Sequence, residues 1–184
     1  MEEMLYPIET FRTKEIELQG LGNLAELSKS EKIYLVLLRH FGCAFSHDTL
    51  LTLAREKERI SQENARIVLV HMADPERAAE LLQDYGLEDV DAVSDPNREI
   101  YQKLGLKRGS FSKVFGLRVW WKALKNGMKN GHPLGSIQGD LYQMPGIFVI
   151  QNEKVVSKFI HKTIADTPDY YALAACESAS AKTN

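Results

Sequence analysis

One cysteine stands where the sequence changes from the pattern of a strand to the pattern of a helix. In LLRHFGCAFSHDTL, residues 37–50, an apolar run ends in Gly42-Cys43 and a helical pattern begins at once. A thiol in the first turn of a helix faces unpaired backbone N–H groups and the positive end of the helix dipole, which stabilise a thiolate. Because the thiolate is the reactive form, this position predicts that Cys43 is a nucleophile, with a buried structural cysteine as the alternative.

Two further residues with useful chemistry, Arg39 and His40, directly precede this junction. A cation beside the thiol would favour its anion further, and a histidine could donate a proton to a leaving group. Neighbouring residues of a strand point to opposite faces, so we expect at most one of the two to approach Cys43 through the strand. For each of them, a plain position at the end of a strand is the alternative.

Buried strands and amphipathic helices alternate on both sides of the cysteine. Apolar runs rich in Val, Ile and Leu predict strands that are covered on both faces, and apolar residues at helical spacing predict the helices between them. The predicted strands are 33–39, 66–71 and 90–93, and the predicted helices are 46–61, 74–86 and about 95–105. This alternation is typical of the α/β class.

A β-hairpin and a last helix complete the expected order. The runs IFVIQ and KVVSKFI predict paired strands at 147–151 and 154–160. The final helix is expected to begin at Thr167-Pro168, because proline is favoured in the first helical turn. The polar residues 177–184 are expected to form a flexible tail.

The stretch 107–143 interrupts this order with six glycines and is predicted to be an insertion. It concentrates basic and aromatic side chains, which could hold an acidic partner, a phosphate or a single-stranded nucleic acid. The alternative is an amphipathic covering helix with a solvated basic face. These side chains are Lys107, Arg108, Lys113, Arg118, Lys122, Lys125 and Lys129 with Phe111, Phe115, Trp120 and Trp121.

Length and composition fit a single globular domain, 1–184. Hydrophobic residues make up 44% and charged residues 26% of the chain, and a net charge of −2 offers no whole-chain attraction to nucleic acid. The acidic N-terminus lacks the cationic and apolar segments of a secretory signal, and no apolar run approaches the roughly 18 residues of a membrane span. We therefore expect a cytoplasmic protein whose cysteines, Cys43 and Cys176, are reduced at rest.

Four segments of the chain together resemble one protein family. They are VLLRHFGCAFS, SDPNREIYQKLGL, VWWKALKNG and GDLYQMPGIFVIQNEKVVSKFIH. Over roughly residues 15–170 the chain resembles the peroxiredoxin-like proteins of the alkyl hydroperoxide reductase and thiol-specific antioxidant (AhpC/TSA) superfamily, in particular the RHFGCxxC branch related to selenoprotein L and peroxiredoxin-like 2. The resemblance, together with the order of the elements, implies a thioredoxin-like fold with a central mixed β-sheet flanked by helices and an insertion before the C-terminal β-hairpin.

The resemblance also implies a role for Cys43 as the peroxidatic nucleophile. Relatives in this branch carry a second cysteine where this chain has Ser46, so an external thiol such as thioredoxin, glutaredoxin or glutathione would have to resolve oxidised Cys43. We interpret Ser46 as a helix cap or as a hydrogen-bond donor to the thiolate, with a plain helix serine as the alternative. Typical peroxiredoxins place Pro and Thr or Ser where this chain has Val36 and His40, so the chain departs from the standard peroxide-binding pattern.

A substrate-binding surface is implied opposite the cysteine. Thioredoxin-like proteins place a cis proline beside the active cysteine, and Pro145 matches that position, although an X-Pro bond is trans by default. The predicted catalytic residues are Cys43, Ser46, Arg39 and His40, and the predicted substrate-binding residues are Met144, Pro145, Gly42 and Phe45.

Two hypotheses of function follow. The first is a thiol-dependent redox enzyme in which Cys43 reduces a peroxide or a disulfide without a cofactor or metal, since the histidines show no metal-ligand spacing with the cysteines. The second is a redox-inactive or sensing thioredoxin-fold protein that binds a partner through the basic insertion. Neither hypothesis involves a membrane, a nucleic acid is not the expected partner, and a homodimer is left open. Cys176, in the apolar run ALAAC, is predicted to be a packing residue and is the only other thiol of the chain.

Overall fold

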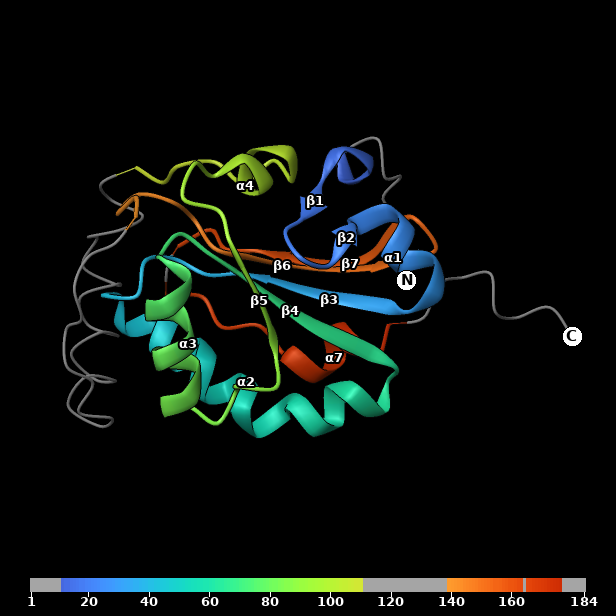
Figure 1. Cartoon of the computed structure of the whole chain (residues 1–184), viewed down its shortest axis with the longest axis horizontal. Helices are drawn as coiled ribbons and strands as arrows, with labels where there is room; N and C mark the ends of the chain where they lie inside the picture. The colour runs from blue at the N-terminus through green and yellow to red at the C-terminus, as the bar shows by residue number, and fades with distance from the viewer. Residues whose placement is uncertain (1–10, 111–138, 164, 177–184) are drawn as a thin grey trace, which may run out of the picture.

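The computed structural model describes residues 11–110, 139–163 and 165–176, and its centre is a five-stranded sheet in the order β5-β4-β3-β6-β7 (Figure 1). The middle strand, β3 (Lys32–Leu37), is parallel to β4 (Ala65–His71) and antiparallel to β6 (Gly146–Gln151). Outside them, β5 (Asp91–Ser94) pairs in parallel with β4, and β7 (Lys154–Ile160) pairs antiparallel with β6. The sheet is therefore mixed, as the sequence predicted.

Helices cover both faces of this sheet (Figure 1). One face carries α2 (Ala44–Gln62), α3 (Pro75–Asp84) and α7 (Tyr170–Ala174). The other face carries α1 (Leu24–Ser30) and α4 (Glu99–Lys103), together with the short pair β1 (Glu17–Leu18) and β2 (Gly22–Asn23) and the 3-10 helix η2 (Thr13–Glu15). The protein thus has three layers, with the sheet in the middle.

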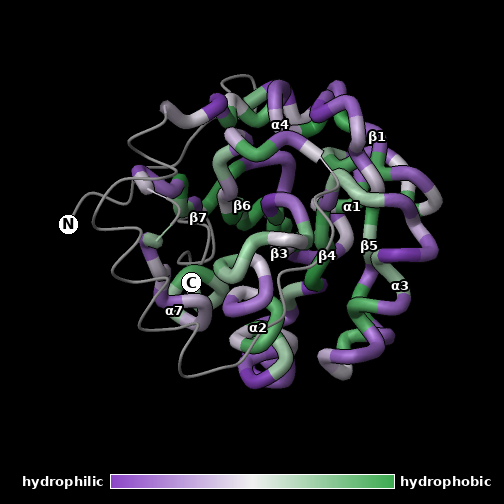
Figure 2. Tube along the Cα trace, turned by 90° about the vertical axis from the view of Figure 1, so that its left-hand side faces the viewer, coloured by the Kyte–Doolittle hydropathy of each residue, from purple (hydrophilic) through white to green (hydrophobic). Residues whose placement is uncertain are grey.

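The position of β3 explains why its sequence is apolar throughout. Tyr34 and Val36 pack in the layer of α2, whereas Ile33, Leu35 and Leu37 pack in the layer of α4. A strand covered on both faces needs apolar side chains at every position, not only at alternate ones. The helices show the complementary pattern: in Figure 2 the tube of α2 alternates between hydrophobic and hydrophilic residues, as expected for a helix with one face on a sheet.

Most predicted elements are confirmed, with ends shifted by one or two residues. β3 ends at Leu37, however, so Arg39 and His40 follow the strand and do not belong to it. The next helix, α2, begins at Ala44, and the turn between the two elements carries Cys43.

Two helices begin later than predicted. The carboxylate of Asp95 accepts hydrogen bonds from the backbone N–H groups of Glu99 and Ile100, and α4 begins only at Glu99. The last helix, α7, begins at Tyr170 because Asp169, not Thr167, is its N-cap. The elements before residue 31 were not predicted. Strands of two residues carry no periodic signal, and the seven residues of α1 are too few for a clear helical period.

The two ends of the predicted insertion 107–143 lie side by side. Arg108 and Gln143 form an isolated antiparallel bridge, and the N–H of Gly109 donates to the carbonyl of Tyr142 at 2.7 Å. Residues 111–138, with most of the basic and aromatic cluster, lie outside the described residues, as does the predicted tail 177–184. Within the described part of the chain, none of the helices has the length and apolar character to cross a membrane.

Candidate active site around Cys43

Cys43 is the N-cap residue of α2 and is 7% exposed. Its backbone is extended, with φ −94° and ψ 120°, and its carbonyl accepts hydrogen bonds from the N–H groups of Ser46 at 2.9 Å and His47 at 3.3 Å. Its own N–H donates to the carbonyl of His40 at 3.1 Å. The turn between β3 and α2 therefore fixes the cysteine at the positive end of the helix dipole, as predicted.

Arg39 is the residue that contacts the thiol. Its Nη1 donates to Sγ of Cys43 at 2.7 Å, its Nε donates to the carbonyl of Gln143 at 3.1 Å, and its Nη2 donates to the carbonyl of Leu141. The side chain is 3% exposed, and no carboxylate of the described residues forms an ion pair with it. A buried guanidinium needs a counter-charge, and the sulfur is the one of its three acceptors that can ionise. The arrangement therefore places a buried cation directly against the sulfur of Cys43.

His40 does not share this role. Its ring is buried, and burial, with a smaller contribution from the Arg39 cation, lowers the pKa of His40 to about 4, against a weaker opposing effect of Asp140. The imidazole is therefore neutral at pH 7, so it is not an additional cation for the thiolate. Only Arg39 of these two residues donates a hydrogen bond to the sulfur, but both residues follow β3, so the alternation of strand faces behind the expectation does not apply to them.

A histidine that the sequence did not single out for this role fixes the turn itself. His47, in the first turn of α2, is buried, with Nε2 2.7 Å from the carbonyl oxygen of Phe41 and Nδ1 2.7 Å from Oη of Tyr85. A carbonyl can only accept, so Nε2 carries the proton, and in the neutral ring Nδ1 accepts from the tyrosine. Burial, followed by the charges of Asp48 and Asp84, raises the pKa of Tyr85, which keeps its hydroxyl protonated.

Tyr101 fixes the end of β3 from the opposite face of the sheet. Its hydroxyl lies 2.7 Å from the carbonyl oxygen of Leu38 and 3.0 Å from that of Val70. Complete burial raises the pKa of Tyr101 well above its usual value, so the group acts as a donor. The turn is thus fixed from both layers of helices. Spacing along the chain gives no signal for either contact, because Tyr85 and Tyr101 are distant in sequence from the residues they bond.

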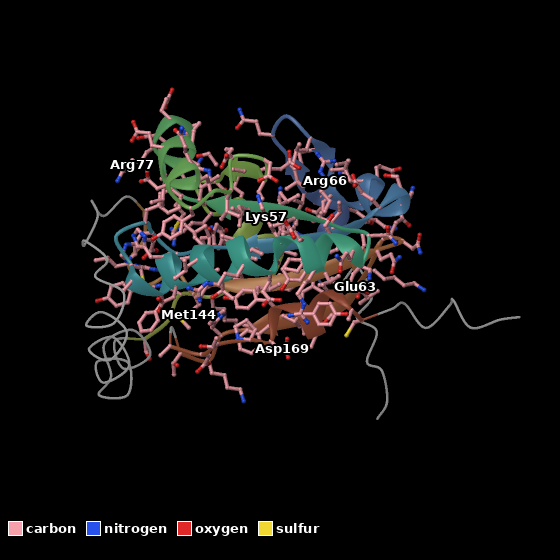
Figure 3. All side chains as sticks on the ribbon, turned by 90° about the horizontal axis from the view of Figure 1, so that it is seen from below. Lys57, Glu63, Arg66, Arg77, Met144 and Asp169 are labelled. Atoms are coloured by element: carbon pink, nitrogen blue, oxygen red, sulfur yellow. The ribbon has the colours of Figure 1, made fainter. Side chains whose placement is uncertain are left out.

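Two of the predicted substrate-binding residues, Met144 and Pro145, lie close to a third, Phe45. Met144 is buried in a small cluster with Ala165 and the half-buried Phe45 and Tyr142, and Figure 3 shows it beside the first turns of α2. Pro145 follows it, and the bond between the two is trans, as are all peptide bonds of the described residues.

Ser46 lies one turn into α2 and is 3% exposed. It is not the helix cap, because Cys43 holds that position, and its hydroxyl forms no hydrogen bond to the sulfur or to any other described atom. The serine lines a cavity of about 50 Å³, which Pro145, Phe45 and Arg39 also line. Gly42 is buried within the turn. The structure therefore brings four of the predicted residues to one cavity, and it corrects the interpretation of Ser46 as a cap or as a donor to the thiolate.

Cys176 lies at the other end of the molecule. It follows α7, is half-buried, and its sulfur donates only a weak contact of 3.4 Å to the carbonyl of Ala172. Among the residues that the structure describes, no group of three or more His, Cys, Asp or Glu side chains is arranged to hold a metal ion.

Sequence comparison identifies similar proteins. The sequence profile of the family "AhpC/TSA antioxidant enzyme" matches residues 52–163, more than half of the chain; the match begins within α2, C-terminal to Cys43. Peroxiredoxin-like 2C of Bos taurus is 25% identical over 139 residues, which are 68% of this chain and 58% of that protein. The chain thus spans less than two thirds of the length of this relative.

Several solved structures have a similar fold. Reduced Prx3 of Vibrio vulnificus superposes with a TM-score of 0.60 at 14% identity, covering 89% of this chain and 92% of that one. The bacterioferritin comigratory protein of Xanthomonas campestris gives 0.60 at 13% identity, covering 89% and 90%. The Vibrio vulnificus protein in complex with hydrogen peroxide gives 0.55 at 14% identity, covering 84% and 83%. At such identities the likeness concerns the fold, and it confirms the thioredoxin-like α/β fold that the sequence predicted.

Proposed function

Because the chain belongs to the AhpC/TSA antioxidant enzyme family, we propose that it is a thiol-dependent peroxidase in which Cys43 reduces a peroxide and an external thiol regenerates the cysteine. One relative is named a peroxiredoxin-like protein, and one structural neighbour was solved with hydrogen peroxide, which supports a peroxide as the substrate. We propose thioredoxin, glutaredoxin or glutathione as the reductant and the cytoplasm as the location, because thiols are kept reduced there.

The observation that carries the proposal is the buried contact between Arg39 and Cys43, 2.7 Å from nitrogen to sulfur. A guanidinium is always charged in a protein, and two carbonyl dipoles compensate its charge less well than an anion does. A thiolate at Cys43 supplies that anion next to the guanidinium. It lies at the start of α2, where the helix dipole also stabilises it. A neutral structural thiol would only accept a weak hydrogen bond from this cation, whereas a thiolate also compensates its charge.

In the proposed reaction the Cys43 thiolate attacks one oxygen of a peroxide, ROOH. An S–O bond forms while the O–O bond breaks, so the sulfur becomes a sulfenic acid and RO⁻ leaves. RO⁻ then takes a proton from solvent and departs as an alcohol, or as water when R is hydrogen. His40 is not an acid in this step, because its low pKa, about 4, leaves it neutral at pH 7.

Two external thiols would complete the cycle. The first converts the sulfenic acid into a mixed disulfide and releases water, and the second attacks that disulfide and restores the Cys43 thiolate. Ser46 has no sulfur, so it cannot form the disulfide with oxidised Cys43 that the first external thiol forms. Cys176 is held at the far end of the sheet, where Lys32, at the start of β3, donates to the carbonyl of Ala174.

The test is peroxide consumption by the wild type and by Cys43→Ser, with dithiothreitol, glutathione or thioredoxin as the reductant. We expect turnover with at least one reductant in the wild type and none above background in the variant. If both proteins consume peroxide equally, or if neither does so with any reductant, the proposal is wrong.

A second test restores the missing thiol. In Ser46→Cys, peroxide should convert the product from a sulfenic acid or mixed disulfide into an internal disulfide, since C-x-x-C at a helix start holds two sulfurs within bonding range. Ser61→Cys, on the exposed far end of the same helix, is the matched control and should leave the product unchanged. Mass spectrometry distinguishes the products, and an unchanged product in Ser46→Cys would contradict the prediction.

A further inference from the structure

The cavity beside Ser46 is a candidate binding site in its own right. Its volume is about 50 Å³, and because one water needs about 10–15 Å³, it admits a group of roughly three or four heavy atoms. Arg39 lines it, and the guanidinium of the same residue contacts Sγ of Cys43. Ser46 contributes a buried hydroxyl without a hydrogen-bond partner. A ligand with a polar end would satisfy this group, which native proteins rarely leave unpaired.

The charged groups of the wall indicate which ligand fits. Asp48 of α2 and Asp166 of the loop before α7 both line the cavity. Burial alone would raise the pKa of Asp166, but hydrogen bonds from Thr163 and Lys162 outweigh it and lower the pKa, so the group is an anion at neutral pH. Among the described residues of the wall, Arg39 is the single Lys or Arg, and His161 is a further basic side chain whose charge adds to the lowering of the Asp166 pKa. The wall therefore combines a cation at the sulfur with two carboxylates.

We propose that this cavity binds a small aminothiol, with its thiolate toward Arg39 and its ammonium toward Asp48 and Asp166. This inference rests on the proposed function. Among the reductants named there it disfavours glutathione, which carries two carboxylates, and it names a small aminothiol as the thiol that resolves the mixed disulfide. When Cys43 is oxidised to a neutral sulfenic acid or disulfide, Arg39 loses its anionic partner and attracts the sulfur of an incoming thiolate. The two carboxylates attract an ammonium group and repel a thiol that carries a carboxylate.

The chemical step is an exchange that needs no further oxidant. The aminothiolate attacks the outer sulfur of a mixed disulfide Cys43–S–S–R. An S–S bond forms between the aminothiol and that outer sulfur, the S–S bond to Cys43 breaks, and the Cys43 sulfur is released as a thiolate beside Arg39. The electron count is conserved, since one disulfide is replaced by another. The same step can therefore be measured without peroxide.

The experiment starts from Cys176→Ser protein in which Cys43 has been methylthiolated with methyl methanethiosulfonate. Loss of the methylthio group is followed by intact mass with cysteamine, 2-mercaptoethanol or 3-mercaptopropionate as the attacking thiol. Each rate is divided by the rate for a methylthiolated cysteine in a short unstructured peptide, which removes the intrinsic reactivity of each thiol. We expect the normalised rates to fall from cysteamine to mercaptoethanol to mercaptopropionate, by about fivefold at each step, and to converge at high salt.

Variants locate the effect in the cavity. In Asp48→Asn the advantage of cysteamine over mercaptoethanol should fall by several fold, whereas Asp84→Asn, an exposed aspartate at the end of α3 outside the cavity, should keep it. Equal normalised rates for the three thiols, a preference for mercaptopropionate, or the same loss in both variants would each overturn the proposal. A protein with the preference but without peroxide turnover would overturn only the proposed peroxidase function.

Discussion

Two buried cations stand at opposite ends of β3, and they are compensated in different ways. Lys32, at the start of the strand, is 6% exposed, and its ammonium donates to the carbonyl of Ala174 at 2.9 Å. Arg39, just beyond the end of the strand, donates to two carbonyls and to the sulfur of Cys43. A carbonyl accepts a hydrogen bond but cannot ionise, whereas a thiol can. The Lys32 end is therefore a structural tie between β3 and α7, and the Arg39 end can become an ion pair.

The two cysteines also lie at opposite ends of β3, one near each buried cation. Cys43 lies beside Arg39 at the start of α2, and Cys176 lies beyond Ala174, the carbonyl partner of Lys32. The six residues of β3 span about 20 Å and the nineteen of α2 about 28 Å. Tyr171, in α7, bonds Glu63 at the far end of α2, which Figure 3 shows well away from Met144. A disulfide needs Cα atoms within about 7 Å, so the folded chain cannot join these cysteines.

The largest expected difference between the two ends is in peroxide chemistry. After one equivalent of hydrogen peroxide, dimedone should label Cys43 almost completely and Cys176 hardly at all. Among the described residues, a cation contacts the sulfur of Cys43 but none contacts that of Cys176. Peptide mass spectrometry with and without glutathione gives both occupancies. An intramolecular Cys43–Cys176 disulfide would break the comparison, since α7 would then have to detach to deliver the second sulfur.

Acid should affect the Cys43 end first. Burial, together with the smaller repulsion from Arg39 at His40, lowers the pKa values of His40 and His71 to about 4 in the folded protein. His40 follows β3 and His71 is the last residue of β4, so both lie at the edge of the sheet from which the turn to Cys43 begins. In the unfolded chain they bind protons near pH 6.5, so stability is full above that pH and is lost as the pH falls from about 6.5 to about 4. Each histidine contributes roughly 1–3 kcal/mol to this loss.

Urea unfolding between pH 7 and pH 4 measures the total loss, and hydrogen exchange locates it. Amides of residues 38–43 should lose protection at a higher pH than those of α7, which carries no buried histidine. His71→Asn should reduce the acid-induced loss. If residues 38–43 and α7 lost protection at the same pH, the acid effect would not come from the buried histidines near Cys43.

Removing each cation separates reactivity from stability. Arg39→Met should lower the rate of Cys43 alkylation by iodoacetamide at pH 7 by about tenfold or more, because the thiolate loses its buried partner. Arg39→Lys keeps the charge but not the three hydrogen bonds, so its alkylation rate should lie between those of the wild type and Arg39→Met. This variant is the control for a loss of rate that comes only from misfolding. Lys32→Met should leave that rate within about twofold and instead loosen α7, raising the alkylation of Cys176. Equal effects of Arg39→Met and Lys32→Met on Cys43 would show that both act through stability.

The sequence predicted the parts of this site that are local in the chain. The apolar run, the turn at Gly42-Cys43 and the helix after it are neighbours, so their geometry follows from strand and helix patterns. The assignment of Arg39 as a candidate came from the same proximity. Ser46 was misread for a related reason: the pattern places it in the first turn but does not reveal that Cys43 itself occupies the N-cap.

The contacts that the sequence did not reveal connect distant segments. The bond from Arg39 to Gln143, the bond from Tyr101 to Leu38 and the pair of His47 and Tyr85 each join residues at least 38 positions apart. Such contacts depend on how helices pack on the sheet, which no spacing along the chain encodes. The start of α4 differed for another reason, since Asp95 bonds into the helix from four residues before it.

The smallest predicted effect concerns the bond that fixes the turn. Tyr85→Phe removes the hydroxyl that donates to Nδ1 of His47, so the ring is free to take its other tautomer and lose its bond to the carbonyl of Phe41. One neutral hydrogen bond contributes about 1 kcal/mol, so we expect Cys43 alkylation to slow by about three- to fivefold. Tyr171→Phe is the matched control: it removes a hydroxyl bonded to Glu63 at the opposite end of α2 and should leave Cys43 unchanged. In His47→Gln, whose amide can still donate to the carbonyl of Phe41, the rate should lie closer to the wild type than in His47→Ala. If the two tyrosine variants slow Cys43 equally, the turn responds only to the overall stability of α2, and His47 has no positioning role of its own.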